Sequence, residues 1–581
     1  MRIKHFFGLA VIAAMTASCS SNNDLVNGGN GSGENETGAS YASFSINLPT
    51  RSGTRATDLT FDKGNAKEYD VFNATLLVFK EGTTAGEGNY TLAEKVDLGS
   101  MEPWKASSET GVTTQAKITA KLEKVDKNGN FFALVLLNNG SGADAKVTLP
   151  SEGEKFSDWN VAAKANPDNF TDPKKGFYMA NAPLYNSTDK SVTTLVPIKK
   201  ENIFSTEAQA SSGEAAADIY VERGLAKVTL TAATKDKKTV DASSSYAGDE
   251  VTINNWALDV TNKKTFPIHN VDGLTTEYAE IWNNDAATTT GPSTKRFVDN
   301  SEAIAKRVYW GTDPNYKETN LSEATEESKN ARIENFKYVK KGDLTADPKD
   351  PQYCLENTFN LENMVQGQTT RVVFKGTYTP KSITPDENGT FYKIGKNVAL
   401  WNSADLEKHI AAAVTKVVAD ASAAGASTTI TLKGSDNDLT TAGNHMLKAS
   451  NITVTKATGD VVTLQPEDVT AINDKLGLSE GYGISTYEKG ESYYIARIKH
   501  FGDALTPWNS GAYGNDNLAY LGRYGMLRNN WYELDVQSVS GPGYPDVPDV
   551  KPSTPDDEDD KYIKVSVKIL DWAKRSQSVV L

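Results

Sequence analysis

The side chains that most often perform catalysis are few in this chain and widely spaced. No two of the five histidines stand at the spacing of a metal-binding pair. The sequence also lacks the motifs of zinc hydrolases, α/β-hydrolases, nucleotide-binding loops and dinucleotide-binding folds. We therefore expect neither enzymatic activity nor a bound metal or cofactor. The histidines are His5, His269, His409, His445 and His500.

Three further features could carry chemistry, and each has a simpler structural interpretation. Cys354 could be a nucleophile with a distant histidine, but a lone cysteine is more often a buried apolar residue. The acidic run 556–560 lacks the spacing and glycine of a calcium loop, which favours a solvated charge run. Trp531 and Tyr532 near Arg528 could form a carbohydrate platform, but the alternation in NNWYELDV predicts a strand with one core face.

Length and composition indicate a globular protein of several domains. The chain has 581 residues, of which 38% are hydrophobic, so two or three domains with ordinary cores are expected. The formal net charge is -14, and no stripe of lysine and arginine appears. Because binding to phosphates needs a basic face, nucleic acid is excluded as an expected partner.

The N-terminal segment MRIKHFFGLAVIAAMTASC has the pattern of a lipoprotein signal peptide. Arg2 and Lys4 precede a short apolar run, and small residues precede Cys19. Cleavage before Cys19 would leave its thiol and amine to carry acyl chains that anchor the protein to a membrane. An ordinary signal peptide is the alternative. If Cys19 is acylated, Cys354 has no partner for an internal disulfide.

The first strand signal follows a polar spacer rich in Gly, Ser and Asn. In YASFSINLP every second residue is apolar, which predicts a strand with one apolar face. The next residues, TRSGTRATD, place Arg51 and Arg55 in a loop of small residues, where a trypsin-like protease would cut. The apolar row consists of Ala42, Phe44, Ile46 and Leu48.

From there to about residue 540, short strands bounded by turn signals predict antiparallel sandwiches. Two helices are expected among them. Helical spacing marks residues 404–423, and Pro466 opens a second helix over 466–478. A polar stretch before YVERGLAKVTL suggests a domain boundary near residue 217.

The C-terminal end combines a spacer with a strand. Residues 541–560 contain five prolines and end in five acidic residues, which predicts an extended, self-repelling linker. About twenty residues at roughly 3.3 Å each reach on the order of 60 Å. The strand that follows could therefore pair with another molecule or fold back onto its own domain. Its apolar row consists of Ile563, Val565, Val567 and Ile569.

Several segments together resemble one family over essentially the whole chain. They are the leader with Cys19, YASFSINLPTRSGTRATD, ERGLAKVTL, WALDVTNKKTF, YCLENTF, TTRVVFKGTY, YGMLRNNWYELDV and YIKVSVKILDWAKRSQSVVL. In this order they resemble the Mfa-type fimbrillins, major subunits of type V pili of anaerobic Gram-negative bacteria. The likeness is most specific near the C-terminus and vague over 80–215 and 404–480.

The resemblance implies a mainly β fold with two tandem antiparallel β-sandwich domains of the transthyretin-like kind. A few short helices and an extended C-terminal donor strand complete it. The implied divisions are a lipoprotein signal peptide (1–18), a propeptide with the spacer and first strand (19–55), an N-terminal β-sandwich domain (56–217), a C-terminal β-sandwich domain (218–540), a Pro/Asp linker (541–560) and the donor strand (561–581).

The resemblance also implies a mechanism of assembly. The precursor would be lipidated at Cys19 and reach the outer membrane. An Arg-specific protease would then cut after Arg55, leaving Ala56 as the new N-terminus, with Arg51 as the alternative site. The strand bearing Phe44 would leave, and the donor strand of another copy would fill its groove.

The implied role is a pilus-shaft subunit acting in adhesion and biofilm formation at the cell surface, with accessory tip and anchor subunits as further partners. The alternative is a monomeric outer-membrane surface lipoprotein that binds glycan or host protein.

Overall fold

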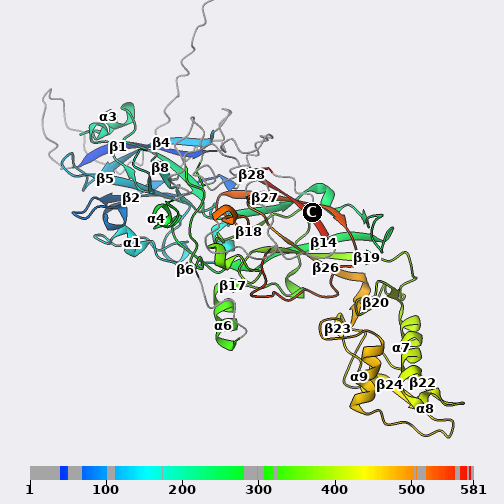
Figure 1. Ribbon diagram of the computed structural model, residues 1–581. Coiled ribbons are helices and arrows are strands. Elements are labelled where there is room, and N and C mark those ends of the chain that lie inside the picture. The colour runs from blue at the N-terminus through cyan, green and yellow to red at the C-terminus, as the bar shows by residue number, and fades with distance from the viewer. Residues whose placement is uncertain are drawn as a thin grey trace, which may run out of the picture.

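The computed structural model shows a mainly β chain with several sheets and short helices (Figure 1). Two β units and an inserted module follow one another along the molecule. The described residues are 39–49, 68–100, 112–172, 174–186, 188–279, 297–298, 307–317, 325–501, 506, 518–556, 563–571 and 575–576.

The first unit is a curled sheet in which the N-terminal strand takes an inner position. Its elements are β1 (Ser40–Pro49), β2 (Ala74–Lys80), β3 (Thr91–Gly99), β4 (Val112–Leu122), β5 (Phe131–Leu137), α1 (Phe156–Trp159), β6 (Ala163–Lys164), α2 (Pro167–Phe170), β7 (Met179–Asn181), β8 (Leu184–Asn186), β9 (Ser191–Thr193), β10 (Val196–Pro197), α3 (Glu207–Ser212) and β11 (Ala217–Arg223). The strand order is β3-β2-β5-β7-β11-β1-β4, with β10 paired to β5. Because the outer strands β3 and β4 also touch, the sheet encloses an apolar core from β1, β2, β5 and β11.

The second unit is a sandwich of two sheets. Its elements are β12 (Ala226–Leu230), β13 (Lys238–Thr239), β14 (Glu250–Asp259), β15 (Thr261–Asn262), β16 (Lys264–Thr265), α4 (Leu274–Glu277), α6 (Glu326–Asn335), β17 (Phe336–Lys337), β18 (Gln352–Cys354), β19 (Arg371–Thr379), β26 (Glu491–Arg497), β27 (Asn530–Val539), β28 (Ile563–Asp571) and β29 (Arg575–Ser576). One sheet is ordered β18-β12-β27-β28-β29 and the other β13-β14-β19-β26. Side chains of β12 and β27 share one core with those of β14, β19 and β26.

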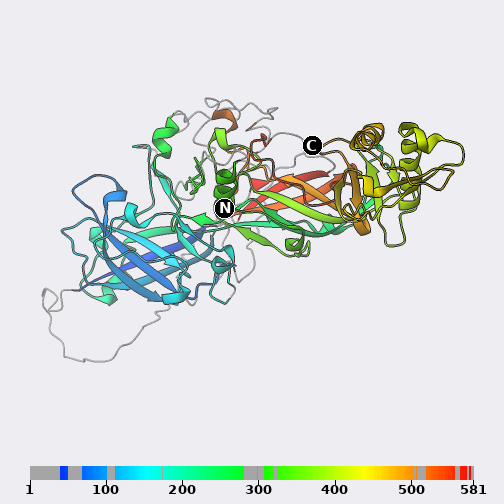
Figure 2. The same cartoon turned by 90° about the horizontal axis from the view of Figure 1, so that it is seen from below.

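A small module, residues 380–490, is inserted between the paired strands β19 and β26. It contains β20 (Phe391–Ile394), β21 (Leu400–Trp401), α7 (Ser403–Val417), α8 (Ala419–Ser422), β22 (Ser427–Ile430), β23 (Gly443–His445), β24 (Ile452–Thr455), α9 (Pro466–Lys475) and β25 (Ile484–Tyr487). The module has its own apolar core and lies at the end of the molecule far from the first unit (Figure 2).

Both predicted helices are confirmed, as α7 and α9. Asn402 caps α7 by accepting a hydrogen bond from the Asp405 amide, and Leu406 and Ile410 lie on its buried stripe. Pro466 occupies the first turn of α9, where its missing amide hydrogen costs nothing.

The passage between the two units falls slightly later than the expected boundary near residue 217. Residues 217–223 form β11, which pairs with β1 and β7 of the first sheet. After Gly224 and Leu225, the chain enters β12 of the second unit. The polar stretch that suggested the boundary includes the short helix α3, which lies against β1.

The C-terminal segment differs from the free linker that its composition predicts. Residues 541–556 lie against the second unit, and Asp556 is fully buried. In the single chain, β28 pairs antiparallel with β27, with Val567 opposite Leu534. The remaining linker residues, 557–560, lie outside the described residues.

Candidate functional site

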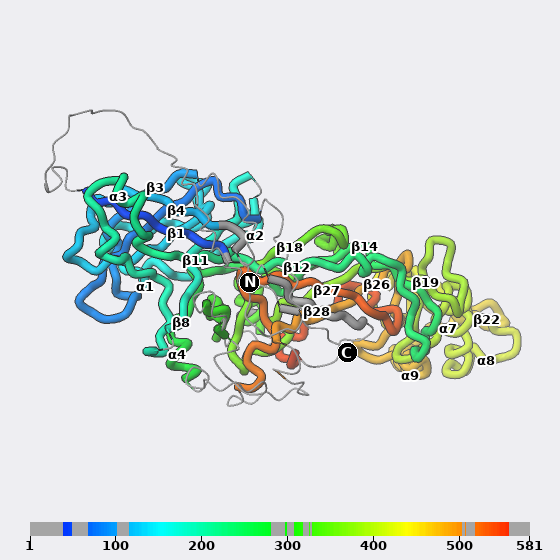
Figure 3. Tube along the Cα trace, turned by 90° about the horizontal axis from the view of Figure 1, so that it is seen from above, coloured from blue at the N-terminus to red at the C-terminus, as the bar shows by residue number. Residues whose placement is uncertain are grey.

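The predicted first strand, β1, lies inside the first sheet rather than at its edge (Figure 3). It runs parallel to β11, with Phe44 opposite Ala217, and antiparallel to β4, with Phe44 opposite Ile118. Its backbone is therefore bonded on both sides. The four apolar side chains of the predicted row, Ala42, Phe44, Ile46 and Leu48, are all fully buried in the core.

The opposite face of β1 is buried as well, which the alternation did not predict. Ser43 donates its hydroxyl hydrogen to the carbonyl of Ala210 in α3, at 2.9 Å. Asn47 donates its side-chain amide to the carbonyl of Ile219 at 3.4 Å. Polar residues on this face are buried because α3 packs over it, and their side chains form hydrogen bonds with the surrounding chain. Loss of β1 would thus expose the surfaces that pack against both of its faces. It would also leave the facing backbone groups of β4 and β11 without their partners.

The direction of β1 places its C-terminal end toward the second unit. β1 runs parallel to β11, and β11 leads directly into β12 of the second unit. The predicted processing residues Arg51, Arg55 and Ala56 lie outside the described residues, as does Cys19. The described chain resumes at Glu68.

Glu68 forms the centre of a buried polar cluster at the junction of the two units. Its carboxylate lies 2.7 Å from the Lys227 ammonium and accepts a hydrogen bond from the Tyr353 hydroxyl at 2.8 Å. Its carbonyl accepts from the Arg223 guanidinium, also at 2.8 Å. The Lys227 ammonium lies 3.8 Å from the centre of the Trp531 ring. Three strands, β11, β12 and β18, thus contact this one residue, and β27 joins the cluster through Lys227.

Burial shapes the ionisation of this cluster. It lowers the pKa of the Arg223 guanidinium to about 10, against the opposing charge of Glu68. Burial and the Glu68 carboxylate both raise the pKa of the Tyr353 hydroxyl, so it remains a hydrogen-bond donor. The polar groups of this cluster are paired with one another. The cluster therefore joins the two units and offers none of these groups to a ligand.

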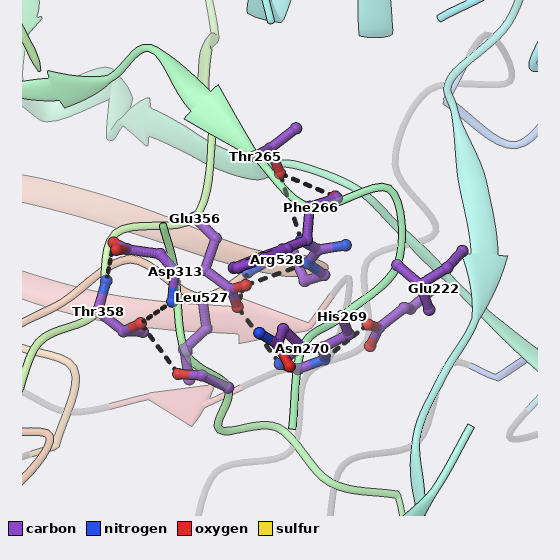
Figure 4. Close-up of polar contacts among 12 residues, drawn as sticks. Glu222, Thr265, Phe266, His269, Asn270, Asp313, Glu356, Thr358, Leu527 and Arg528 are labelled. Carbon is purple, nitrogen blue, oxygen red and sulfur yellow. Dashed lines mark hydrogen bonds and ion pairs between the residues drawn. The ribbon is translucent and has the colours of Figure 1, made fainter. Parts of the chain in front are cut away.

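A second buried ionic network lies nearby and links further elements of the two units (Figure 4). The His269 Nδ1 atom lies 2.8 Å from the Glu222 carboxylate of β11, and its Nε2 atom lies 3.5 Å from Glu356. Arg528, just before β27, contacts Glu356 at 3.2 Å, and Arg307 contacts Glu222 at 3.4 Å. Burial by itself raises the pKa of Glu222, but His269, Arg307 and Arg528 hold it below its usual value.

The sequence prediction did not single out these junction residues, although the signal was present. Most stand in the segments that carry the family resemblance: ERGLAKVTL holds Glu222, Arg223 and Lys227, while YCLENTF holds Glu356. Charged residues inside otherwise apolar strands are rarely buried without partners. The presence of charged residues in apolar strands marks them as candidates for buried pairs, but it does not show which residues pair with which.

The other chemical candidates have structural roles. Cys354 is a free, fully buried thiol, and burial raises its pKa to about 12, which disfavours the reactive thiolate. Tyr532 is buried and lies 2.9 Å from His500 through its hydroxyl. The strand with a core face predicted from NNWYELDV is confirmed as β27, in which Tyr532, Leu534 and Val536 are buried in the core, while Trp531 packs over Lys227.

Within the described ranges, no group of three or more His, Cys, Asp or Glu residues is placed to hold a metal ion. Over the same residues, no helix combines the length and apolar character needed to cross a bilayer.

The structure thus places an N-terminal strand inside the first sheet, ahead of a segment that contains Arg51 and Arg55, and the C-terminal strand β28 between β27 and the short β29. Residues 485–578 match the family model described as major fimbrial subunit protein type IV, fimbrillin, C-terminal. The matched part begins in β25 and extends through β26, β27 and β28. It confirms the resemblance to fimbrillins for this C-terminal part of the chain.

Solved structures give more distant likenesses. A candidate cell adhesion protein from Parabacteroides distasonis shares 11% identity, with 92% of this chain and 98% of that chain covered at a TM-score of 0.36. The tip fimbrial protein Mfa3 from Porphyromonas gingivalis, truncated at its C-terminus, shares 10%, with 92% and 100% covered at 0.26. A fimbrial assembly protein from P. distasonis shares 8%, with 58% and 85% covered, also at 0.26. Scores this low do not establish a common fold. No curated protein matches the chain in sequence.

Proposed function

We propose that this chain is a shaft subunit of a cell-surface fimbrium, and that its copies polymerise by donor-strand exchange. The observation that carries the proposal is the place of β1. An N-terminal strand fills an inner position of the sheet, and the segment that follows it contains Arg51 and Arg55. Once that segment is cut, only non-covalent contacts hold β1. The fimbrillin match over residues 485–578 supports the same class of protein.

Maturation follows from this proposal. The precursor is lipidated at Cys19 and held at the outer membrane until an Arg-specific protease cuts after Arg55, or after Arg51. The mature chain then begins at Ala56, and β1 departs with the lipid. The two β units correspond to two transthyretin-like domains, and tip and anchor subunits bind the ends of the fibre. The assembled fibre acts in adhesion and biofilm formation.

The strand that replaces β1 is β28 of another copy. Its alternating residues Ile563, Val565, Val567 and Ile569 match the spacing of the buried row in β1. In the single chain β28 pairs with β27 on one side and, at Lys568 and Ile569, with the two-residue strand β29 on the other. A slip by one residue would turn its lysines toward the core, so the exchange has a defined register.

The energetics favour exchange once β1 has left. Burial of four Ile- or Val-sized side chains stabilises by roughly 1.5 to 3 kcal/mol each, so on the order of 6 to 12 kcal/mol before the cost of ordering. Backbone hydrogen bonds to β11 and β4 add to this. Because the contact is head to tail and does not close on itself, repetition gives a filament.

One experiment tests the proposal directly. Purified precursor is treated with an Arg-specific protease and run on denaturing gels without boiling. We expect a ladder of oligomers that disappears when residues 561–581 are deleted. Deletion of residues 577–581 alone, which leaves β28 complete, is the matched control and should keep the ladder. A cleaved protein that stays monomeric would refute exchange.

A further inference from the structure

The proline-rich segment 541–556 is fixed to the second unit at its beginning. The hydroxyl of Tyr494 donates to the carbonyl of Gly541 at 3.0 Å, and that of Tyr487 donates to Gly543 at 2.9 Å. Tyr544 and Tyr493 exchange two backbone hydrogen bonds, of 2.8 and 2.9 Å. The segment therefore extends the edge of β26 as a short strand-like contact.

Its middle part is held by an arginine and by close packing. The Arg371 guanidinium bridges the Asp259 carboxylate, at 2.8 Å, and the carbonyl of Pro548, at 2.7 Å. Gly367 lies so close to the segment that a Cβ atom there would stand 2.7 Å from the Cα atom of Pro552. Only glycine permits this approach.

The last described residue of the segment, Asp556, is held most firmly. Its side chain is fully buried, with one carboxylate oxygen 3.5 Å from the Arg497 guanidinium. The other oxygen accepts the hydroxyl hydrogen of Thr369. The Asp556 amide donates to the carbonyl of Met364 at 3.2 Å, and the Gln366 amide donates to that of Thr554 at 2.9 Å. A buried carboxylate with charged and neutral donors is costly to expose.

We propose that Asp556 anchors this segment, and that the segment stays docked both in the monomer and in the fibre. The inference rests on the proposed exchange of β28 and deepens it. With 541–556 fixed, only residues 557–562 connect the second unit to Ile563. Six residues at roughly 3.3 Å each reach about 20 Å, instead of the roughly 60 Å that a free linker would allow.

The consequence is that each donor strand leaves its own subunit from a defined point on the second unit. A short connection raises the effective concentration of the strand near an acceptor within reach and excludes acceptors beyond it. It also limits the distance between successive subunits and the range of angles that they can adopt. Asp556 is thus a positioning residue for assembly, distinct from the strands that exchange.

Hydrogen exchange of single amides in the full mature chain tests the inference, before and after polymerisation. We expect the amides of Gln366 and Tyr544 to be protected in both states. In Asp556→Ala, exchange at Gln366 should be about tenfold faster or more, while Tyr544 keeps its protection. The exposed Asp549 of the same segment provides the matched control, since Asp549→Ala should change neither amide.

Electron microscopy of the fibres gives a second readout. Asp556→Ala fibres should show a broader distribution of bend angles between subunits than wild-type or Asp549→Ala fibres. Thr369→Val removes one hydroxyl and serves if Asp556→Ala does not fold. Loss of protection at Gln366 and Tyr544 on polymerisation of the wild type would overturn the inference. If the wild type never polymerises, the proposed function is refuted instead. Protection of the Gln366 and Tyr544 amides in the monomer would then still decide whether the segment is docked.

Discussion

The carboxylate of Glu68 and the ammonium of Lys227 lie 2.7 Å apart at the junction of the two β units, with side chains only 2% and 3% exposed. Glu68 is the first described residue after the segment that contains the predicted cleavage sites. This ion pair ties the chain just before β2 of the first unit to β12 of the second unit.

The ion pair gives a first prediction. Lys227→Met should destabilise the protein by about 3 to 5 kcal/mol, because it leaves the Glu68 carboxylate buried without its cation. The double variant Glu68→Gln/Lys227→Met should lose less, since the Glu68 carboxylate is removed together with its ion-pair partner and Arg223 keeps its hydrogen bond to the carbonyl of residue 68. Urea unfolding of both variants measures the difference. Equal losses in the two would show that the charge pairing is unimportant.

The buried carboxyl of Asp313 gives a pH prediction. Burial raises its pKa to about 7, against hydrogen bonds from Thr358, Asn315 and Asn262. The folded protein then binds a proton that the unfolded chain, with a pKa near 4, releases as the pH rises. Stability from this group is therefore present at low pH and is lost between about pH 4 and 7.

Asp313→Asn isolates that contribution. Between pH 5 and pH 8 the unfolding free energy of the variant should fall by about 1 to 4 kcal/mol less than that of the wild type. A loss of stability that is the same at both pH values does not affect this difference. Denaturant unfolding at the two pH values is the measurement. A slope unchanged from the wild type would mean that Asp313 is already ionised at pH 5.

The role of β1 gives a prediction that separates precursor from fibre. Phe44→Ala should destabilise the precursor by about 3 to 5 kcal/mol, because it opens a cavity in a fully buried site. Fibres assembled from the same variant should melt like wild-type fibres, since β1 is no longer present. Thermal melting of both forms tests this. A lowered melting temperature of the fibre would place β1 in the assembled state.

The close approach of Gly367 to Pro552 gives a packing prediction. Gly367→Ala should cost about 1 to 3 kcal/mol, because the added methyl group overpacks the contact. Gly342→Ala is the control, since a Cβ there meets nothing within 4 Å. Unfolding midpoints of the two variants should differ. If the two midpoints coincide, the segment moves away from the added methyl group without loss of stability.

The buried thiol of Cys354 gives a chemical prediction. The mature chain from Ala56 onward contains no other cysteine. Because burial raises the pKa of this thiol to about 12, the native protein should not react with a thiol reagent at pH 8. One thiol per chain should react after unfolding in urea. Rapid labelling of the native protein would show that the site opens.

Local sequence patterns predicted strands and helices, whereas the pairing and burial of individual side chains depend on contacts between residues distant in sequence. Alternation located β1 and β28, and helical spacing with caps located α7 and α9. The partner of Glu68 stands 159 positions away, so no local pattern could indicate it. For Asp556, neighbouring acidic residues and prolines predicted solvent exposure. Arg497 and Thr369, which the fold brings to the same place, bury it instead.

The inserted module at residues 380–490 enters and leaves the sandwich at neighbouring positions, since Thr377 lies opposite Glu491 in the ladder of β19 and β26. The module is nevertheless built into the sandwich, because its side chains Phe391, Leu400 and Tyr487 belong to the core of the second unit and Tyr487 also donates to Gly543. In a filament of the proposed kind, this module would recur once on every subunit, at the end of the chain's fold that lies far from the first unit.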